Sequence, residues 1–191
     1  MSTLKVIIAS TRPGRVGRPV GEWFARAARE HGGFDQVEIL DLAEINLPLL
    51  DEPSHPRLRR YTQPHTMAWS AAVEEGDAFV IVSPEYNFSF PASIKNALDY
   101  LWGEWSYKPV GLVTYGGISG GMRSANALRP VLSVLKMVPV TEAVTIPMVS
   151  EQIVEGEFLA NQVNESSATM MLDELVKVQA ALAPLRQTAA V

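Results

Sequence analysis

Short apolar runs alternate along this chain with longer stretches in which apolar residues recur every three or four positions. A run of about four to eight apolar residues is long enough for a buried strand but too short for a helix. These runs predict strands at residues 4–9, 37–42, 79–82, 110–115 and 139–146. The periodic stretches predict one helix that ends near Gly32 and four more at residues 66–75, 91–101, 122–135 and 166–185. Strands and helices are therefore expected to alternate.

This alternation predicts one α/β domain over residues 1–191, in which helices cover both faces of a parallel, five-stranded sheet. Because crossover connections between parallel strands are right-handed, few ways of winding the sheet remain. Two strand orders stay open at this point, the order 2-1-3-4-5 and the Rossmann type. In the first of them, the loops that follow strands one and three lie side by side.

Some segments do not fit the alternation. Residues 43–63 form a long stretch with three prolines, and loops of that length are uncommon and often functional. We interpret it as a flap over a site or a partner contact, with a plain surface excursion as the alternative. Pro130 should kink its helix, because proline removes an internal hydrogen bond. Residues 149–159 are ambiguous, and the tail at 187–191 is expected to fray.

Composition narrows the class of protein. The formal net charge of −5 argues against a general nucleic-acid binder. The chain has no cysteine, which excludes disulfides, thiolate metal sites and cysteine nucleophiles. No uninterrupted apolar segment reaches the roughly 20 residues that span a bilayer. We therefore expect a soluble, cytoplasmic protein that acts on neither nucleic acid nor membrane.

The loop after the first strand carries the clearest sign of an anion site. Residues 10–18 hold three arginines, two hydroxyl side chains and two glycines, and a helix follows. The first N–H groups of a helix lack internal partners and attract anions, and arginine forks onto phosphate. This pattern predicts a phosphate site. The alternative is a solvated basic turn.

Two further loops follow strands three and four. Residues 84–88 read Pro-Glu-Tyr-Asn-Phe and offer a flat apolar surface, an amide and a carboxylate, which suits a planar ligand with polar edges. Residues 116–121 hold four glycines, which let a backbone pass close to a ligand or simply form a flexible turn. A phosphate loop beside an aromatic loop is the layout that a mononucleotide with a large flat base needs.

Three motifs now resemble the NAD(P)H-dependent FMN reductase family. They are Ala-Ser-Thr-Arg-Pro-Gly-Arg-Val-Gly at 9–17, Ser-Pro-Glu-Tyr-Asn at 83–87 with its helix, and Tyr-Gly-Gly-Ile-Ser-Gly-Gly at 115–121. The resemblance implies a flavodoxin-like three-layer sandwich with strand order 2-1-3-4-5 and bound FMN. By resemblance, the residues that bind FMN are Ser10, Arg12, Arg15, Val16, Gly17, Pro84, Glu85, Tyr86, Asn87, Phe88, Gly116, Gly117 and Ser119.

The resemblance also implies an activity. NADPH or NADH would pass hydride through FMN to a small acceptor, such as a flavin, a quinone, an azo or nitro compound or a metal oxyanion. No protein side chain is expected to be catalytic, and Glu85 should matter through its position rather than its proton. His31, His55 and His65 show no metal-ligand spacing. The alternatives are a flavodoxin-type electron carrier and a sensor or scaffold without turnover.

Members of that family are dimers or tetramers, so a homodimer or homotetramer is implied here. Trp102, Trp105 and Tyr107 would suit a subunit interface, since aromatic residues are enriched at interface cores. Packing within one subunit is the equal alternative.

Overall fold

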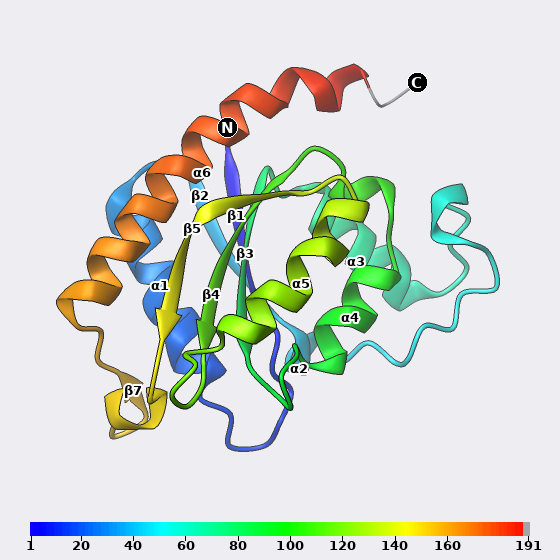
Figure 1. The fold of residues 1–191 in the computed structure, drawn as a ribbon. Coiled ribbons are helices and arrows are strands. Elements are labelled where there is room, and N and C mark those ends of the chain that lie inside the picture. Colours follow the sequence, from blue (N-terminus) through cyan, green and yellow to red (C-terminus); the bar gives the residue numbers. More distant parts are fainter. Residues whose placement is uncertain (189–191) are drawn as a thin grey trace.

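The structure, a computed structural model, describes the backbone of residues 1–188 and side chains as far as Arg186. It contains a parallel sheet with strand order β2-β1-β3-β4-β5 (Figure 1). Its strands are β1 Thr3–Ile8, β2 Gln36–Asp41, β3 Ala78–Pro84, β4 Pro109–Tyr115 and β5 Val138–Ile146. The predicted fold class and the order 2-1-3-4-5 are confirmed, and the Rossmann-type order is excluded.

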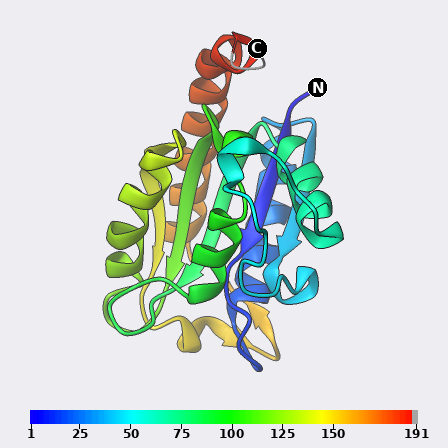
Figure 2. The ribbon, with the colours of Figure 1, turned by 90° about the vertical axis from the view of Figure 1, so that its right-hand side faces the viewer.

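Helices cover both faces of the sheet, which gives three layers (Figures 1 and 2). One face carries α1 Gly17–His31 and α6 Gln162–Thr188, and the other carries α3 Pro64–Glu74, α4 Ala92–Asp99 and α5 Met122–Val134. Side chains alternate along each strand, so Val80 and Val82 join the first core while Phe79 and Ile81 join the second. Strands buried on both faces explain why the sequence shows apolar runs rather than alternation.

The final helix packs closely on the sheet. It begins at Gln162, a few residues before the predicted start, and lies against β4, β5 and α1. A Cβ atom at Gly111 of β4 would lie 2.5 Å from the sulfur of Met171, so this approach requires a residue without a side chain. At the other end, the indole Nε1 of Trp23 donates to Glu165 at 2.9 Å. The helix thus closes the core that α1 begins.

The region that remained ambiguous has regular structure of its own. It holds a 3₁₀ turn at Val149–Gln152 and a small hairpin of β6 Ile153–Val154 and β7 Glu157–Phe158. Glu155 and Gly156 turn the hairpin with φ values of 51° and 88°. Pro130 lies inside α5, which continues past it to Val134. The tail predicted to fray is residues 187–191, of which 189–191 lie outside the described part of the chain.

The long segment at 46–63 lies on α4, with short helices α2 Leu42–Ile45 before it and η1 Pro56–Leu58 within it. The side chain of Asn96 donates to the carbonyl of Pro48 at 2.7 Å and accepts from the N–H of Leu50 at 2.9 Å. The hydroxyl of buried Tyr100 donates to the same Pro48 carbonyl at 3.1 Å. Burial raises the pKa of Tyr100 to about 12.

The far end of this segment is fastened to α3. The carboxylate of Glu52 accepts the N–H groups of Thr62 and Gln63 at 2.9 to 3.0 Å, directly before the helix begins. Asp51 pairs with His65 in the first turn of α3 at 2.9 Å. Hydrogen bonds thus hold the segment on its own subunit at both ends, and its role as a flap or a partner contact stays a prediction.

Two absences concern the described residues only. None of their helices is both long enough and apolar enough to cross a bilayer. They also hold no group of three or more His, Asp or Glu side chains arranged to bind a metal ion.

Candidate functional site

The three predicted loops meet at one edge of the sheet. The register pairs Ile8 with Val82 and Pro84 with Tyr115, so β1, β3 and β4 end at the same level. The order of the strands reverses between β1 and β3, which is where ligands bind in open α/β sheets. The loops lie together at the lower edge of the sheet in Figure 1.

A cavity of about 140 Å³ lies between these loops. It is lined by Ser10, Arg12, Arg15, Val16, Pro84, Glu85, Tyr86, Tyr115, Gly116 and Val149. Eight of these belong to the set predicted from sequence. Of that set, Asn87, Phe88, Gly117 and Ser119 lie outside the cavity wall, and Gly17 lies beneath Tyr115.

The first loop gives the cavity its positive charge. Ser10 is buried, and its hydroxyl forms a 2.8 Å hydrogen bond with the hydroxyl of Tyr86. The guanidinium of Arg15 is held by buried Asp41 at the end of β2, at 2.5 Å. Arg12 is exposed and forms no ion pair among the described residues. The arginines therefore differ: Arg15 is fixed in place and Arg12 is available.

Two polar atoms at the cavity have no partner among the described residues. Arg15 Nε and the hydroxyl of Tyr115 are buried without a hydrogen bond, although buried polar atoms are almost always bonded. No side chain caps the N-terminus of α1, and its first turn carries no acidic residue. Unsatisfied donors beside an uncapped helix N-terminus are what a phosphate or hydroxyl group of a ligand would satisfy.

Tyr115 was missed as a site residue, although the sequence placed it at the end of a strand. It is 4% exposed, and burial raises the pKa of its phenol above the usual value. A Cβ atom at Gly17 would lie 2.5 Å from the Tyr115 hydroxyl, so this glycine makes room for the phenol. Val149, the other lining residue that was missed, comes from the region left ambiguous.

The second loop is a tight hairpin. Tyr86 and Ser89 exchange two backbone hydrogen bonds of 2.8 and 3.0 Å, and Asn87 and Phe88 between them have φ values of 48° and 69°. Two left-handed residues in succession form a type I′ turn, in which phenylalanine is unusual. Its ring is 70% exposed, and the guanidinium carbon of Arg123 lies 4.0 Å from the ring centroid.

Glu85 joins the second loop to the glycine turn. Its carboxylate accepts hydrogen bonds from the Ser119 hydroxyl at 2.9 Å and from the Arg123 backbone N–H and guanidinium at 3.1 and 2.7 Å. Burial alone would raise the pKa of Glu85, but the hydrogen bonds from Arg123 and Ser119 outweigh it and lower that pKa. This carboxylate is ionised and fully engaged, which suits positioning rather than proton transfer.

The four glycines of the turn divide into two pairs. A Cβ atom at Gly120 or Gly121 would lie 2.5 and 2.7 Å from side chains of neighbouring strands, and both residues have positive φ. Those two glycines are required by the turn itself. A Cβ atom at Gly117 would meet nothing within 4 Å, and one at Gly116 nothing closer than 3.4 Å. The second pair leaves open surface beside the hairpin.

The size of the cavity limits what it holds. Small-molecule sites are usually about 300–1,000 Å³. The 140 Å³ cavity therefore has room for the phosphate end of a mononucleotide, and a planar group has the open surface of Gly117 and Phe88 beside it. The donor set, the charge and this adjoining surface fit FMN.

The three histidines lie away from the cavity. His31 and His65 pair with Asp173 and Asp51, and the ring of His55 accepts the backbone N–H of Arg57. Trp105 is buried between Trp69 and Phe79, so for this residue packing within the subunit is confirmed.

Comparison with known proteins agrees with this geometry. Residues 3–151 match the model of the NADPH-dependent FMN reductase family. The chain is similar to an NAD(P)H-dependent FMN reductase of Schizosaccharomyces pombe, with 39% identity over 79% of this chain and 76% of the relative. It is also 30% identical to an FMN-dependent NADPH-azoreductase of Staphylococcus saprophyticus, over 90% of this chain and 92% of the relative.

Among solved structures, the flavoenzyme NAD(P)H:acceptor oxidoreductase FerB of Paracoccus denitrificans superposes with a TM-score of 0.75 at 20% identity. The alignment covers 95% of this chain and 98% of that one, and it supports the fold. From the match over residues 3–151 and the identity to the relatives, we conclude that this chain belongs to the NADPH-dependent FMN reductase family.

Proposed function

We propose that this chain is an FMN-dependent NAD(P)H oxidoreductase that reduces small acceptors. When bound, FMN supplies the redox chemistry, taking hydride from the nicotinamide and passing electrons on to the acceptor. The observation that carries the proposal is the cationic cavity with two unpartnered buried polar atoms, next to an open surface at the end of β3 and β4.

The first loop would hold the FMN phosphate. Arg12 and Arg15 line the cavity, and the ion pair with Asp41 fixes the Arg15 guanidinium in place. The Ser10 hydroxyl is shared with Tyr86 and can donate to the ligand instead. The hydroxyl of Tyr115 would gain the partner that it lacks.

The second and third loops would orient the ring. Glu85 fixes the hairpin against the glycine turn through Ser119 and Arg123, so the backbone N–H groups of both loops keep their spacing. The phenyl ring of Phe88 and the open surface at Gly117 would lie beside the ring system.

The acceptor side is apolar. Ile118 is 93% exposed and Met122 is 56% exposed, both next to the glycine turn. Together with Phe88, they offer flat apolar contact, which favours aromatic acceptors such as flavins, quinones, azo and nitro compounds over a hydrated metal oxyanion. We further propose that the protein works in the cytoplasm, which fractionation of cells would test.

The test is the visible absorption of the FMN-loaded protein under anaerobic conditions. Addition of NADPH should bleach the flavin rapidly, and a quinone should then restore the colour. A parallel titration with NADH measures the preference for the donor. If dithionite bleaches the flavin but neither nicotinamide does so at a useful rate, the protein is an electron carrier or a sensor and the proposal is wrong.

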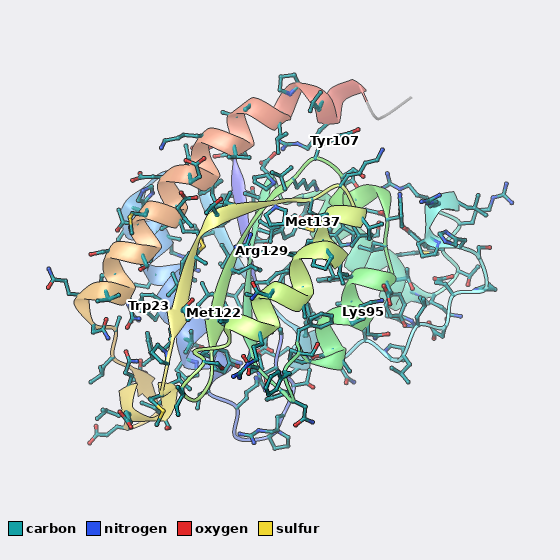
Figure 3. The ribbon with its side chains drawn as sticks, in the orientation of Figure 1. Trp23, Lys95, Tyr107, Met122, Arg129 and Met137 are labelled. Atoms are coloured by element: carbon teal, nitrogen blue, oxygen red, sulfur yellow. The ribbon has the colours of Figure 1, made fainter. Side chains whose placement is uncertain are left out.

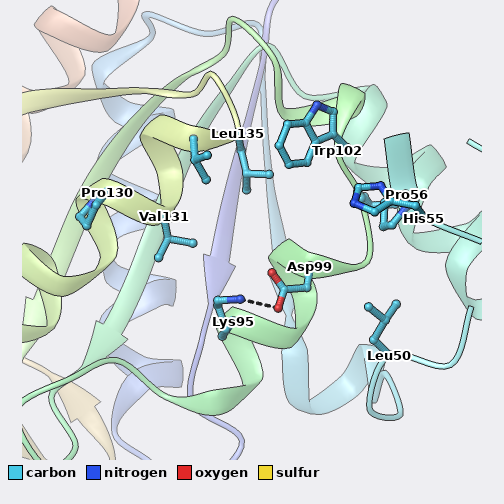
Figure 4. A pocket seen from close by; sticks show the side chains of 11 residues that line it. Leu50, His55, Pro56, Lys95, Asp99, Trp102, Pro130, Val131 and Leu135 are labelled. Atoms are coloured by element: carbon cyan, nitrogen blue, oxygen red, sulfur yellow. Dashed lines mark hydrogen bonds and ion pairs between the residues drawn. The ribbon is translucent and has the colours of Figure 1, made fainter. Parts of the chain in front are cut away.

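We also propose that two copies associate through the groove between α4 and α5 (Figure 4). The groove has a volume of about 540 Å³ and is lined mainly by apolar side chains, among them Leu50, Trp102 and Val131. Lys95 and Asp99 pair with each other on its wall at 2.5 Å. Around a twofold axis, such a pair can exchange partners with its copy, which makes the surface self-complementary.

The mass of the protein in solution tests this association. Val134 lines the groove and is 61% exposed, so Val134→Glu should convert a dimer to a monomer by placing charge in the contact. Val163, which is 70% exposed on α6, provides the matched control, since Val163→Glu should leave the mass unchanged. A dimer that survives Val134→Glu would place the interface elsewhere.

A further inference from the structure

A second polar cavity lies at the opposite end of the sheet from the flavin site. It has a volume of about 330 Å³ and includes Tyr107 and Lys108, directly before β4 begins. Because β4 spans seven residues, the two sites are roughly 20 Å apart along the strand. In Figure 3, Tyr107 is labelled in the upper part of the molecule and Met122, at the start of α5, below its middle. This cavity is therefore separate from the flavin site.

The cavity is strongly basic in an acidic protein. It is lined by five cationic side chains, from Arg57, Arg59, Lys108, Lys136 and Arg186, against the carboxylates of Glu74 and Glu104. The chain as a whole has a net charge of −5. Four segments that are distant in sequence thus place basic residues on one concave surface, which raises the local concentration of anions.

The carboxylates at the cavity are already engaged. Arg59 pairs with Glu74 at 2.8 Å and with buried Glu104 at 3.4 Å, and Arg186 pairs with Asp77 at 3.0 Å. With Asp77 counted, the cations still outnumber the carboxylates by two.

Arg57 and Lys136, like Lys108, form no ion pair among the described residues. The guanidinium carbon of Arg57 lies 4.0 Å from the centroid of Trp102, and the Nζ of Lys136 lies 5.4 Å from the centroid of Tyr107. Contact with aromatic rings holds both side chains at the cavity while leaving their charge unneutralised. Arg57 and Lys136 therefore contribute positive charge that no carboxylate among the described residues neutralises.

The backbone at Lys136 is unusual for a lysine. Its φ is 61°, its N–H bonds to the carbonyl of Ser133 at 3.0 Å, and the next N–H, of Met137, bonds to the carbonyl of Leu132 at 3.1 Å. This is the Schellman end of α5, where the left-handed residue is usually glycine. The carbonyl of Lys136 in turn accepts the N–H of Tyr107, which is also left-handed at φ 59°. Lys136 therefore places a positive charge at a backbone position that usually holds glycine.

Lys108 adds a buried cation. It is 6% exposed, and its Nζ donates to the carbonyls of Val73 and Glu74 at 2.9 and 3.0 Å. Burial lowers the pKa of Lys108 to about 8. An anion in the cavity would favour the charged form of this lysine.

We propose that this cavity binds a small molecule through its phosphate group. Arginine forks onto phosphate oxygens and lysine serves as a compact charge beside them, which matches Arg57 and Lys136. The volume of about 330 Å³ fits a small phosphorylated molecule and exceeds the need of a single ion. The proposal does not depend on the redox activity.

The test uses the FMN-loaded protein, so that the flavin phosphate site is filled, at low ionic strength. Calorimetric titration with inorganic pyrophosphate should show one site per subunit. Arg57→Gln and Lys136→Gly should each weaken binding about tenfold, the loss expected for one charge-assisted contact. Lys177→Gln, on the exposed face of α6, should bind as the wild type does.

Lys136→Gly also separates binding from folding. Glycine adopts φ 61° without strain, so this variant should unfold at the same or a higher temperature than the wild type. Loss of pyrophosphate binding by a protein that is no less stable would confirm the site. Wild-type protein that binds no pyrophosphate, or a Lys136→Gly variant that binds it unchanged, would overturn the proposal.

Two further titrations identify the source of the phosphate. Tighter binding of adenosine monophosphate than of inorganic phosphate would assign the site to a phosphorylated organic molecule. The opposite order would assign it to free phosphate or pyrophosphate, and both orders support a phosphate site.

Discussion

Two irregular segments flank the same sheet, and they differ in how their polar groups are satisfied. In the short loop at 9–16, the buried Nε of Arg15 has no hydrogen-bond partner and Arg12 forms no ion pair among the described residues. The much longer segment at 46–63 is fastened to α3 and α4 by Asn96, Tyr100 and Glu52. Length alone suggested that the long segment was functional. Among the described residues, buried polar atoms without partners, rather than length, mark the loop that awaits the flavin, while the long segment offers only its unpaired Arg57 to the second cavity.

The largest expected effect falls on the short loop. Arg12→Gln should weaken FMN binding about 10- to 100-fold, because one charge-assisted contact with phosphate is lost. Binding of riboflavin, which has no phosphate, should be unchanged, and so should the stability of the FMN-free protein. The control is Arg26→Gln, because Arg26 is also an exposed arginine but lies on α1. Equal loss of riboflavin binding would show that Arg12 acts through the fold.

The converse holds for the long segment. Tyr100→Phe removes the hydroxyl that donates to Pro48 and should lower the free energy of unfolding by about 1 kcal/mol, because one hydrogen bond is lost while Asn96 still donates to the same carbonyl. Urea unfolding followed by tryptophan fluorescence measures this. FMN affinity of the folded variant should equal that of the wild type. A change in affinity as large as that of Arg12→Gln would remove the distinction between the segments.

A smaller, pH-dependent effect is expected at Glu52. Burial would raise its pKa, but the hydrogen bonds from Gln63 and Thr62 lower it from 4.5 to about 2. A lowered carboxyl pKa stabilises the fold above the unfolded pKa, and this contribution is lost as the pH falls from about 4.5 to 2. Glu52→Gln should therefore be less stable than the wild type at neutral pH, and the difference should vanish near pH 2. A difference that is constant with pH would contradict this.

The smallest effect is expected at Glu85. Its carboxylate is ionised and bonded to Ser119 and Arg123, so Glu85→Gln should keep the rate of flavin reduction by NADPH within about tenfold of the wild type. A general base contributes about 10²–10⁴-fold. Stopped-flow absorption with FMN bound distinguishes the two cases, and a loss of several orders of magnitude would make Glu85 catalytic.

The sequence was enough to predict the sheet and the position of the loops. Short apolar runs such as 79–82 are too short for a helix and are therefore predicted as strands. In a parallel sheet, the loops that directly follow the strands all lie at the carboxyl edge. The predicted strand order and the family are confirmed.

The side-chain partners could not be predicted in the same way. Tyr115 ends a strand buried on both faces, so no alternation tells which way its phenol points. The pairing of Arg15 with Asp41 and the stacking of Arg123 on Phe88 join segments that only the packed layers bring together. For the same reason, the sequence did not reveal that residues 46–63 are fastened down.

The docking of α6 has a consequence for the order of assembly. Helix α6 follows every strand of the sheet along the chain, and it completes the layer that contains α1 by packing over a strand that offers Gly111 in place of a side chain. During synthesis, the β4–β5 part of this sheet face therefore stays exposed until α6 has been made. Termination between β7 and α6, after residue 158 and before residue 162, would release a protein that has the three flavin loops but leaves the β4–β5 part of one sheet face uncovered, and such a fragment should depend on chaperones.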